Sequence, residues 1–210
     1  MPTPIYHITH IDNLESIISA GGLLAYNTMH TARIHYTNIA CENIQYRRAT
    51  FRVPCGVGGV LHDYVPFYFA PRSPMLYSIN KGYVASYTQG QEPVIHRVSD
   101  VFNIENVGLD FVFTDGHAVM KLTTFFDNLY ELYQIDWDVM EARYWNDTDE
   151  DNDRKRRRQA EFLVRNFFPW QLIAQIGVIN SAIQAQVENI LQNFTRQTCC
   201  NSPSKLVLLK

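Results

Sequence analysis

The chain has 210 residues, of which 46% are hydrophobic and 19% are charged, and its formal net charge is −3. This composition is that of a globular protein and excludes a disordered chain, and the length predicts a single domain over residues 1–210. The net charge alone argues against a nucleic-acid-binding protein, because such domains are usually basic overall.

Targeting signals and metal-binding patterns are missing from the sequence. It has no run of about 18 apolar residues, so no contact with a membrane is predicted, and its first residues lack the basic and apolar regions of a signal peptide. The cysteines are Cys41, Cys55, Cys199 and Cys200. They form no Cys-x-x-Cys pair, and no histidines have the spacing of metal ligands. We therefore expect a cytoplasmic protein with reduced cysteines and no metal.

The first predicted elements are a strand and a helix. Residues 5–8 have the pattern of a short strand, and Asp12 is a candidate N-cap with Glu15 three residues later, as in a capping box. The pair Gly21-Gly22 ends this helix by supplying a residue that tolerates a positive φ. Residues 25–50 are polar and weakly periodic, which predicts a long loop with at most a short helix.

A strand and a capped helix follow. Residues 65–69 read as a strand, and Pro66 favours an edge strand or a strand start because proline has no N–H to donate. Ser73 before Pro74 has the pattern of an N-cap and first helical residue, which predicts a helix to about residue 80.

The second half of the chain alternates strands and helices. Strands are predicted at residues 94–98 and 110–113, a turn at Asp115-Gly116, and a helix at residues 123–133. Further elements are a strand at residues 161–164, an amphipathic helix at residues 181–194 and a strand at residues 206–209. The mixed order of short strands and helices predicts an α+β fold with a central split sheet.

One dense block of charge lies at residues 147–158, where five acidic residues are followed by five basic ones. The block has two interpretations. It is either an exposed loop that neutralises itself, as charge runs usually are, or a local patch that contacts a polyanion.

Motifs of common enzyme classes are absent: the sequence contains no G-x-G-x-x-G, G-x-x-x-x-G-K-[ST], H-E-x-x-H or G-x-S-x-G. The glycines of residues 56–59 are better explained by turns than by a phosphate-binding loop. Taken alone, His7 is interpreted as a hydrogen-bonded, partly buried histidine, and Glu161 as a surface carboxylate at a strand start.

Four segments, spread in order over about the whole chain, resemble one known family. They are YHITHIDNL at residues 6–14, DYVPFYFAPRSPMLY at 63–77, FTDGHA at 113–118 and RQAEFLV at 158–164. They resemble the DarT family, the DNA ADP-ribosyltransferase toxins of bacterial toxin–antitoxin pairs. The long internal segment is specific, whereas any three-residue piece of it is not.

The resemblance implies an ADP-ribosyltransferase fold, in which a split mixed β-sheet with flanking helices surrounds an NAD cleft. NAD is then a consumed co-substrate, and its ADP-ribose is transferred to a base, most often thymine, in single-stranded DNA. The implied partner besides DNA is a macrodomain antitoxin similar to DarG. The alternatives are the same fold acting on guanine, RNA or protein, and a non-catalytic module that binds NAD or nucleic acid.

The resemblance also implies roles for individual residues. Glu161 matches the catalytic glutamate, and counting back from Asp63 favours Arg48 as the catalytic arginine, with Arg47 and Arg52 as alternatives. His117 is the third implied catalytic residue and matches the turn near the target base, where many relatives carry asparagine, which leaves the choice of base open. The expected NAD contacts are His7, Thr9, Asn13, Arg52, Tyr68, Met75 and Tyr77.

The basic half of the charge block lies directly before Glu161, where the family's loop helps to select the acceptor. The expected DNA contacts are therefore Arg154, Lys155 and Arg156. Arg157 and Arg158 are closer to the strand and are expected to support it.

Overall fold

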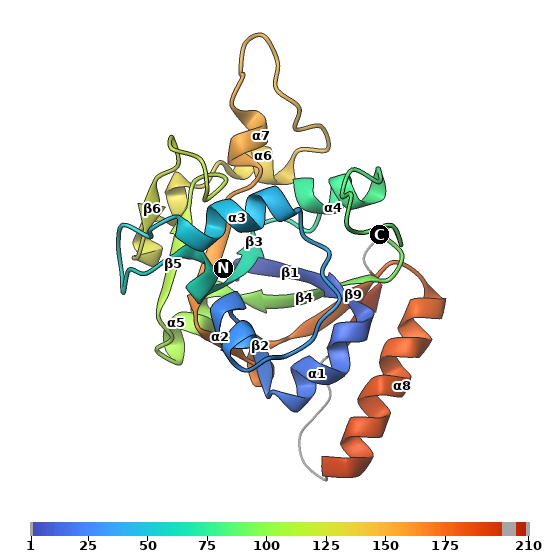
Figure 1. The fold of residues 1–210 in the computed structure, drawn as a ribbon. Coiled ribbons are helices and arrows are strands. Elements are labelled where there is room, and N and C mark those ends of the chain that lie inside the picture. The colour runs from blue at the N-terminus through green and yellow to red at the C-terminus, as the bar shows by residue number, and fades with distance from the viewer. Residues whose placement is uncertain (1, 199–204, 209–210) are drawn as a thin grey trace.

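The computed structural model describes residues 2–198 and 205–208. Its large sheet is made of β1 (Pro4–His10), β3 (Tyr64–Tyr68), β4 (Val94–Asp100), β5 (Phe111–Thr114), β6 (Phe125–Phe126), β7 (Glu161–Arg165), β9 (Gln175–Val178) and β10 (Lys205–Leu208). Within the described residues the strand order is β10-β9-β4-β1-β3-β7-β5-β6. Figure 1 shows β4, β1 and β3 together at the centre of the molecule, with β5 and β6 on the left. β10 and β9 are parallel and the other neighbours are antiparallel, so the sheet is mixed, as predicted. β2 (Gly22–Leu24) and β8 (Phe167–Pro169) form a second, two-stranded sheet.

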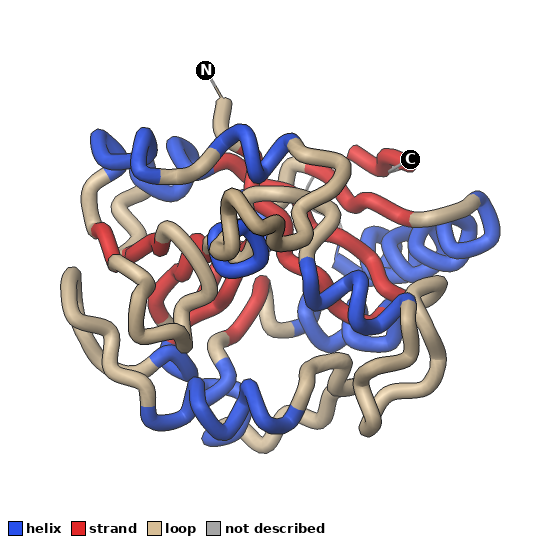
Figure 2. The backbone as a smooth tube through the Cα atoms, turned by 90° about the horizontal axis from the view of Figure 1, so that it is seen from above, coloured by secondary structure: helices blue, strands red, loops and turns tan. Residues whose placement is uncertain are grey.

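Helices lie on both sides of the strands when the molecule is seen from above (Figure 2). They are α1 (Leu14–Ser19), α2 (Tyr26–Thr31), α3 (Glu42–Thr50), α4 (Pro74–Asn80), α5 (Val101–Asn106), α6 (Trp137–Glu141), α7 (Arg154–Arg157) and α8 (Ser181–Thr198). None of the helices in the described ranges has the length and apolar character that crossing a bilayer requires.

The sheet is split between β1 and β3. Within the described part of the chain these strands pair at Tyr6 and Tyr68 alone, whereas β1 pairs with β4 along its whole length. Further along, the Nδ1 atom of His7 lies 2.8 Å from the carbonyl oxygen of Pro66. The N–H and C=O of a strand residue point to the same side, so the missing N–H of Pro66 also faces β1. Pro66 therefore lies at the point where the hydrogen-bond ladder between β1 and β3 ends.

The expectation that Pro66 marks an edge strand or a strand start is wrong, because β3 lies inside the sheet between β1 and β7. The physical reason is the split, which leaves β3 locally without a paired neighbour on its β1 side. The proline is tolerated there as it would be at a true edge.

The start of α1 also differs from the expectation. A 3₁₀ turn at Ile11–Asn13 comes first, and its cap is His10, whose Nδ1 accepts a hydrogen bond from the Asp12 N–H at 3.1 Å. Asp12 is therefore not the N-cap. The predicted end of the helix is confirmed, since Gly21 has a φ of 75° and its N–H bonds to the carbonyl of Ile18.

Two segments have a secondary structure that their periodicity did not reveal. Residues 25–50 contain both α2 and α3 rather than a loop with at most one short helix. The helix predicted over residues 123–133 is wrong, because the segment forms β6 and then a 3₁₀ helix at Leu129–Gln134. The ring of Phe126 stacks on Phe113 of the neighbouring strand, so the apolar spacing reflected packing on the sheet.

The remaining predicted elements are confirmed within small shifts of their ends. Ser73 caps α4 by accepting a hydrogen bond from the Leu76 N–H at 3.2 Å, and the strands at 94–98, 110–113 and 161–164 and the helix at 181–194 are all present. The last strand is confirmed through Leu208. Leu209, Cys199 and Cys200 lie outside the described residues.

Candidate active site

A cleft of about 430 Å³ opens where β1 and β3 separate. This volume lies in the range of small-molecule sites. Five of the residues predicted to contact NAD line it, namely His7, Thr9, Asn13, Tyr68 and Met75, together with the predicted catalytic residues Arg48, His117 and Glu161. The split in the sheet therefore brings together residues that are far apart in the chain, from His7 to Glu161.

Arg52 and Tyr77 lie outside this lining in the described part of the chain. Arg52 is exposed and belongs to an isolated bridge with Val60. Tyr77 is about half exposed and packs edge-on against Trp145, with 5.8 Å between ring centroids.

Glu161 is the centre of the site. It begins β7 opposite Tyr68 of β3 and is only 3% exposed, so its interpretation as a surface carboxylate is wrong. One carboxylate oxygen lies 2.7 Å from Nη1 of Arg48. The other lies 3.3 Å from Nδ1 of His117 and accepts a hydrogen bond from the Ala118 N–H at 3.1 Å.

These partners decide the charge of Glu161. Burial by itself would raise the pKa of its carboxyl, but the charge of Arg48 and the hydrogen bond and charge of His117 outweigh burial and hold the pKa at about 2. Glu161 is thus ionised throughout the physiological range. The site contains a fixed anion next to a fixed cation.

The three arginines near residue 50 have different partners. Arg48 is buried and paired with Glu161, whereas Arg47 donates from Nη2 to the carbonyl of Val119 at 2.5 Å. Arg52 is exposed, as described above. Of the three, Arg48 is the one that contacts the candidate catalytic carboxylate.

Arg48 retains an unused donor. Its Nη2 is buried and has no hydrogen-bond partner among the described residues. A buried donor without a partner costs about 1–3 kcal/mol, and more when it is charged, so such an atom in a cleft indicates a ligand oxygen. The donor fits a substrate that carries phosphate, hydroxyl or carbonyl oxygens, as NAD and a DNA base do.

His7 presents a neutral ring to the cleft. A carbonyl oxygen can only accept, so the proton on the ring is at Nδ1, facing Pro66, and Nε2 is left as an acceptor. Burial, and then the positive charge of Arg97, lowers the pKa of His7 to about 4. The prediction of a hydrogen-bonded, partly buried histidine is confirmed.

Asn13 shapes the wall of the cleft through its side-chain amide. Its Nδ2 donates to Oγ1 of Thr9 at 3.0 Å and to the carbonyl of Thr37 at 2.9 Å, and its Oδ1 accepts from the Thr37 N–H at 2.7 Å. The amide thereby ties the segment between α2 and α3 to β1. Asn13 and Thr9 thus hold the two sides of the cleft together.

His62 is a cleft residue that the sequence did not reveal. It is buried, its Nε2 lies 2.9 Å from Oε1 of Gln45, and the ring of Tyr26 packs on it at 4.1 Å. Burial, and then the charge of Arg48, lowers its pKa to about 4. The one available signal was its position directly before the segment that begins at Asp63, and no spacing or motif marked it as functional.

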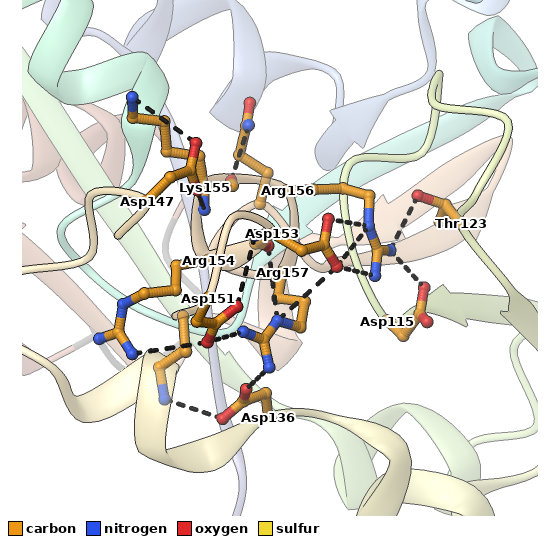
Figure 3. A network of polar contacts seen from close by, with 12 residues as sticks. Asp115, Thr123, Asp136, Asp147, Asp151, Asp153, Arg154, Lys155, Arg156 and Arg157 are labelled. Atoms are coloured by element: carbon orange, nitrogen blue, oxygen red, sulfur yellow. Dashed lines mark hydrogen bonds and ion pairs between the residues drawn. The ribbon is translucent and has the colours of Figure 1, made fainter. Parts of the chain in front are cut away.

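The basic half of the charge block forms α7 and contacts the acidic half (Figure 3). Lys155 is the most exposed of the three predicted DNA contacts, with 53% of its side chain accessible, against 26% for Arg154 and 12% for Arg156. Each of the three pairs with an aspartate. The segment is therefore a short helix whose charges are largely compensated within the protein.

Arg157 and Arg158 anchor the start of β7, as expected. Arg157 pairs with Asp136 at 2.5 Å and with Asp151 (Figure 3). The buried guanidinium of Arg158 donates to the carbonyls of Arg72 and Val139. The chain is thus fixed on both sides just before Glu161.

The chain matches known proteins over almost its whole length. Residues 6–203 match the family model described as "ssDNA thymidine ADP-ribosyltransferase, DarT". A relative from Thermus sp. (strain 2.9), named DNA ADP-ribosyl transferase, is 50% identical over 92% of this chain and 89% of its own length. A protein of the same name from Escherichia coli O127:H6 is 36% identical over 89% of this chain and 85% of its own length.

Solved structures agree with the sequence comparisons. The structure of Thermus sp. 2.9 DarT in complex with ADP-ribosylated ssDNA has a TM-score of 0.91 at 45% identity, covering all of this chain and 95% of the other. The complex of the same protein with NAD+ has a TM-score of 0.87 at 44% identity and covers 96% of that chain. The chain therefore belongs to the DarT family of ssDNA thymidine ADP-ribosyltransferases.

Proposed function

We propose that this protein is an NAD-dependent ADP-ribosyltransferase that modifies thymine in single-stranded DNA and acts as the toxin of a toxin–antitoxin pair. The observation that carries the proposal is the buried contact of Glu161 with Arg48 and His117 in the cleft at the sheet split. Family membership and the NAD+ and DNA complexes of the Thermus relative support the choice of substrates.

In the proposed reaction, the bond between C1″ of the ribose and the nicotinamide nitrogen breaks, and nicotinamide leaves. A bond then forms between C1″ and N3 of thymine, and the N3 proton passes to the carboxylate of Glu161 or to water. Positive charge develops on the ribose as nicotinamide departs, and the ionised Glu161 is suited to stabilise it. The low pKa keeps Glu161 ionised in the cleft, so the carboxylate is available for this stabilisation and for accepting the N3 proton, which becomes acidic as the bond to C1″ forms.

Arg48 and His117 complete the catalytic group. The unpaired Nη2 of Arg48 is a donor for an oxygen of NAD or of the target base. His117 uses Nδ1 on Glu161 and also lines the cleft, so we assign its ring to the acceptor base.

The proposed NAD contacts fall into two groups. His7, Thr9, Asn13, Tyr68 and Met75 line the cleft, whereas Arg52 and Tyr77 are proposed contacts outside the described lining. Nε2 of His7 can accept a hydrogen bond from the nicotinamide amide or a ribose hydroxyl. Burial, and then the charge of Glu161, raises the pKa of Tyr68, so its hydroxyl remains a neutral donor.

The predicted DNA-binding block of Arg154, Lys155 and Arg156 precedes Glu161 directly in the chain, and we assign contact with DNA to its more exposed members. The more exposed Lys155 and Arg154 are the direct contacts to phosphate in this proposal.

The toxin role implies an antitoxin that removes the modification, and we propose a macrodomain protein similar to DarG. Support comes from a Thermosipho africanus relative named a DNA ADP-ribosyl transferase-DNA ADP-ribosyl glycohydrolase fusion protein, of which this chain covers 46%. In that arrangement residues 1–210 supply one transferase domain. We place its action in the cytoplasm, where NAD and DNA are available.

The test is to incubate the protein with NAD and thymine-containing oligonucleotides and to look for an added ADP-ribose by mass spectrometry. The oligonucleotides include single-stranded and double-stranded DNA, and RNA and guanine-rich strands serve as competing acceptors. An adduct on thymine in single strands supports the proposal. Modification of RNA or guanine alone, or intact NAD binding with no adduct on any acceptor, overturns it.

A further inference from the structure

The loop between β5 and β6 carries the groups that hold Glu161. It contains His117, whose Nδ1 faces the carboxylate, and Ala118, whose N–H donates to it. The loop is closed on itself, because Thr123 donates from Oγ1 to the carbonyl of His117 at 2.8 Å. The position of this loop therefore sets the position of two of the contacts made by the catalytic carboxylate.

Arg156 of α7 fastens that loop from outside. Its Nη1 lies 3.0 Å from a carboxylate oxygen of Asp115 and 3.3 Å from Oγ1 of Thr123, near opposite ends of the loop. Its Nε and Nη2 donate to Asp153 at 2.8 and 2.7 Å. Its own carbonyl accepts a hydrogen bond from the His117 N–H at 3.0 Å. Figure 3 shows the guanidinium between Asp153 on one side and Asp115 and Thr123 on the other.

The contact between Arg156 and the loop is sterically close as well as polar. A Cβ atom on Gly116 would lie 2.3 Å from Nη1 of Arg156 and 3.0 Å from its carbonyl oxygen, so no side chain fits there without a shift. The glycine thus lets the guanidinium lie directly against the backbone of the loop, one residue before His117.

Most N–H donors of Arg156 already have acceptors in Asp153, Asp115 and Thr123. Only 12% of its side chain is exposed, against 53% for the neighbouring Lys155. A phosphate approaching Arg156 would have to displace carboxylates that already occupy both edges of its planar donor group. We therefore do not assign Arg156 a direct contact with DNA.

We propose that Arg156 is a positioning residue, which fixes the loop of residues 115–124 on α7 and so holds His117 and the Ala118 N–H against Glu161. This inference rests on the proposed function and assigns Arg156 a part in it other than DNA contact. Arginine suits the role because its fixed donors span two carboxylates, whereas a lysine ammonium offers one point charge.

The test compares Arg156→Gln, Arg156→Lys and Asp115→Asn with Arg143→Gln, which removes an exposed arginine that packs on Tyr144. With saturating NAD and DNA, we expect kcat for transfer to fall about 10- to 100-fold in Arg156→Gln, since misplacement by about 1 Å can cost 100-fold. Arg156→Lys recovers part of the loss, and Arg143→Gln keeps the unmodified kcat. NAD affinity and the salt dependence of DNA binding stay unchanged in Arg156→Gln.

Two readouts separate positioning from general destabilisation. In the double variant Arg156→Gln/Asp115→Asn, kcat is no lower than in the worse single variant, because both changes break one contact. In ¹⁵N-histidine spectra of the folded protein, the Nδ1 signal of His117 shifts in Arg156→Gln and not in Arg143→Gln.

Several outcomes overturn the inference. They are an unchanged kcat in Arg156→Gln, strictly multiplicative losses in the double variant, an unmoved His117 signal, or a loss confined to DNA affinity with a salt slope reduced by about one. If the unmodified protein transfers ADP-ribose to no DNA, the proposed function fails. The spectra and a melting curve still decide whether Arg156 positions the loop.

Discussion

At the scale of single residues, the main feature is a buried ion pair that is open to a cleft. The side chains of Arg48 and Glu161 are 8% and 3% exposed, and their contact is 2.7 Å. Such pairs contribute little net stability, but removing one partner leaves a buried charge that costs several kcal/mol. The pair is therefore better explained by chemistry at the cleft than by stability.

Replacement of the carboxylate tests this explanation. In Glu161→Gln we expect the rate of transfer to fall at least about 100-fold, because the anion that stabilises the developing ribose charge is lost. NAD affinity, measured by calorimetry, changes less than about tenfold, since the cleft keeps its other contacts. The matched control is the exposed Glu150→Gln. A rate within threefold of the unmodified protein would contradict the assignment.

Two histidines that line the cleft give the protein a defined response to acid. The pKa values of His7 and His62 are about 4, below the ordinary value of 6.5. These two imidazoles take up protons near pH 6.5 in the unfolded chain and only near pH 4 in the folded chain. The free energy of unfolding therefore falls as the pH is lowered from 7 to 4.

We expect His62→Gln to reduce this fall by about 1–3 kcal/mol, as measured by urea denaturation at several pH values. The matched control is His35→Gln, which changes an exposed histidine. An equal slope in His62→Gln and in the unmodified protein would show that His62 is not held neutral by the fold.

At the scale of elements, short pieces of structure are fixed by local hydrogen bonds that the sequence makes visible. The cap of α4 is an example, because Ser73 is buried, accepts from the Leu76 N–H and precedes Pro74 at the first helical position. This helix carries Met75 to the cleft wall. Its cap therefore contributes both to stability and to the shape of the site.

Ser73→Ala is expected to lower the free energy of unfolding by about 0.5–2 kcal/mol, the usual effect of losing an N-cap oxygen. Thermal and urea denaturation measure the change, and Ser86→Ala, at an exposed position, is the control. A loss no larger than that of the control would contradict the capping role.

The charge block shows how far the elements could be inferred from the sequence. Its composition predicted either a self-neutralising segment or a polyanion contact, and the structure shows α7 bound to aspartates on both sides. The block's own aspartates were visible in the sequence. The partners Asp115 and Asp136 were not, because only the fold brings these distant residues to α7.

At the scale of the whole molecule, the net charge of −3 does not reveal that acidic and basic residues are concentrated in one segment of the chain. Five acidic and five basic residues cancel within residues 147–158, so the total says nothing about the partner. Under the proposed function, the attraction of a phosphate backbone is assigned to two local cations of α7, Arg154 and Lys155, which are close in sequence to Glu161.

Binding of single-stranded DNA is expected to weaken linearly in log Kd against log salt concentration. For single strands the slope is about 0.7 for each phosphate contacted, so Arg154→Gln/Lys155→Gln reduces it by about 1 to 1.5. Fluorescence anisotropy between low and high salt measures the slope, with the exposed Lys81→Gln as control. A slope that stays the same in the double variant would place the DNA elsewhere.

The sequence by itself determined the family, the α+β class and several local elements. Four segments in the same order resemble one family, and signals such as Ser73-Pro74 and Gly21 act within a few residues along the chain. It also indicated Glu161, which lies in one of those segments, although its residue type and strand-start position alone suggested the surface.

Only the tertiary structure decided which arginine meets Glu161, that His62 lines the cleft and that Arg156 faces inward. Arg48 and Glu161 are 113 positions apart, and their contact depends on the pairing of β7 with β3 and on the placement of α3. Local patterns cannot specify such contacts, because burial and charge partners arise from how distant segments pack. The tertiary contacts of Glu161 therefore set its pKa, and with it the negative charge that the carboxylate carries in the cleft.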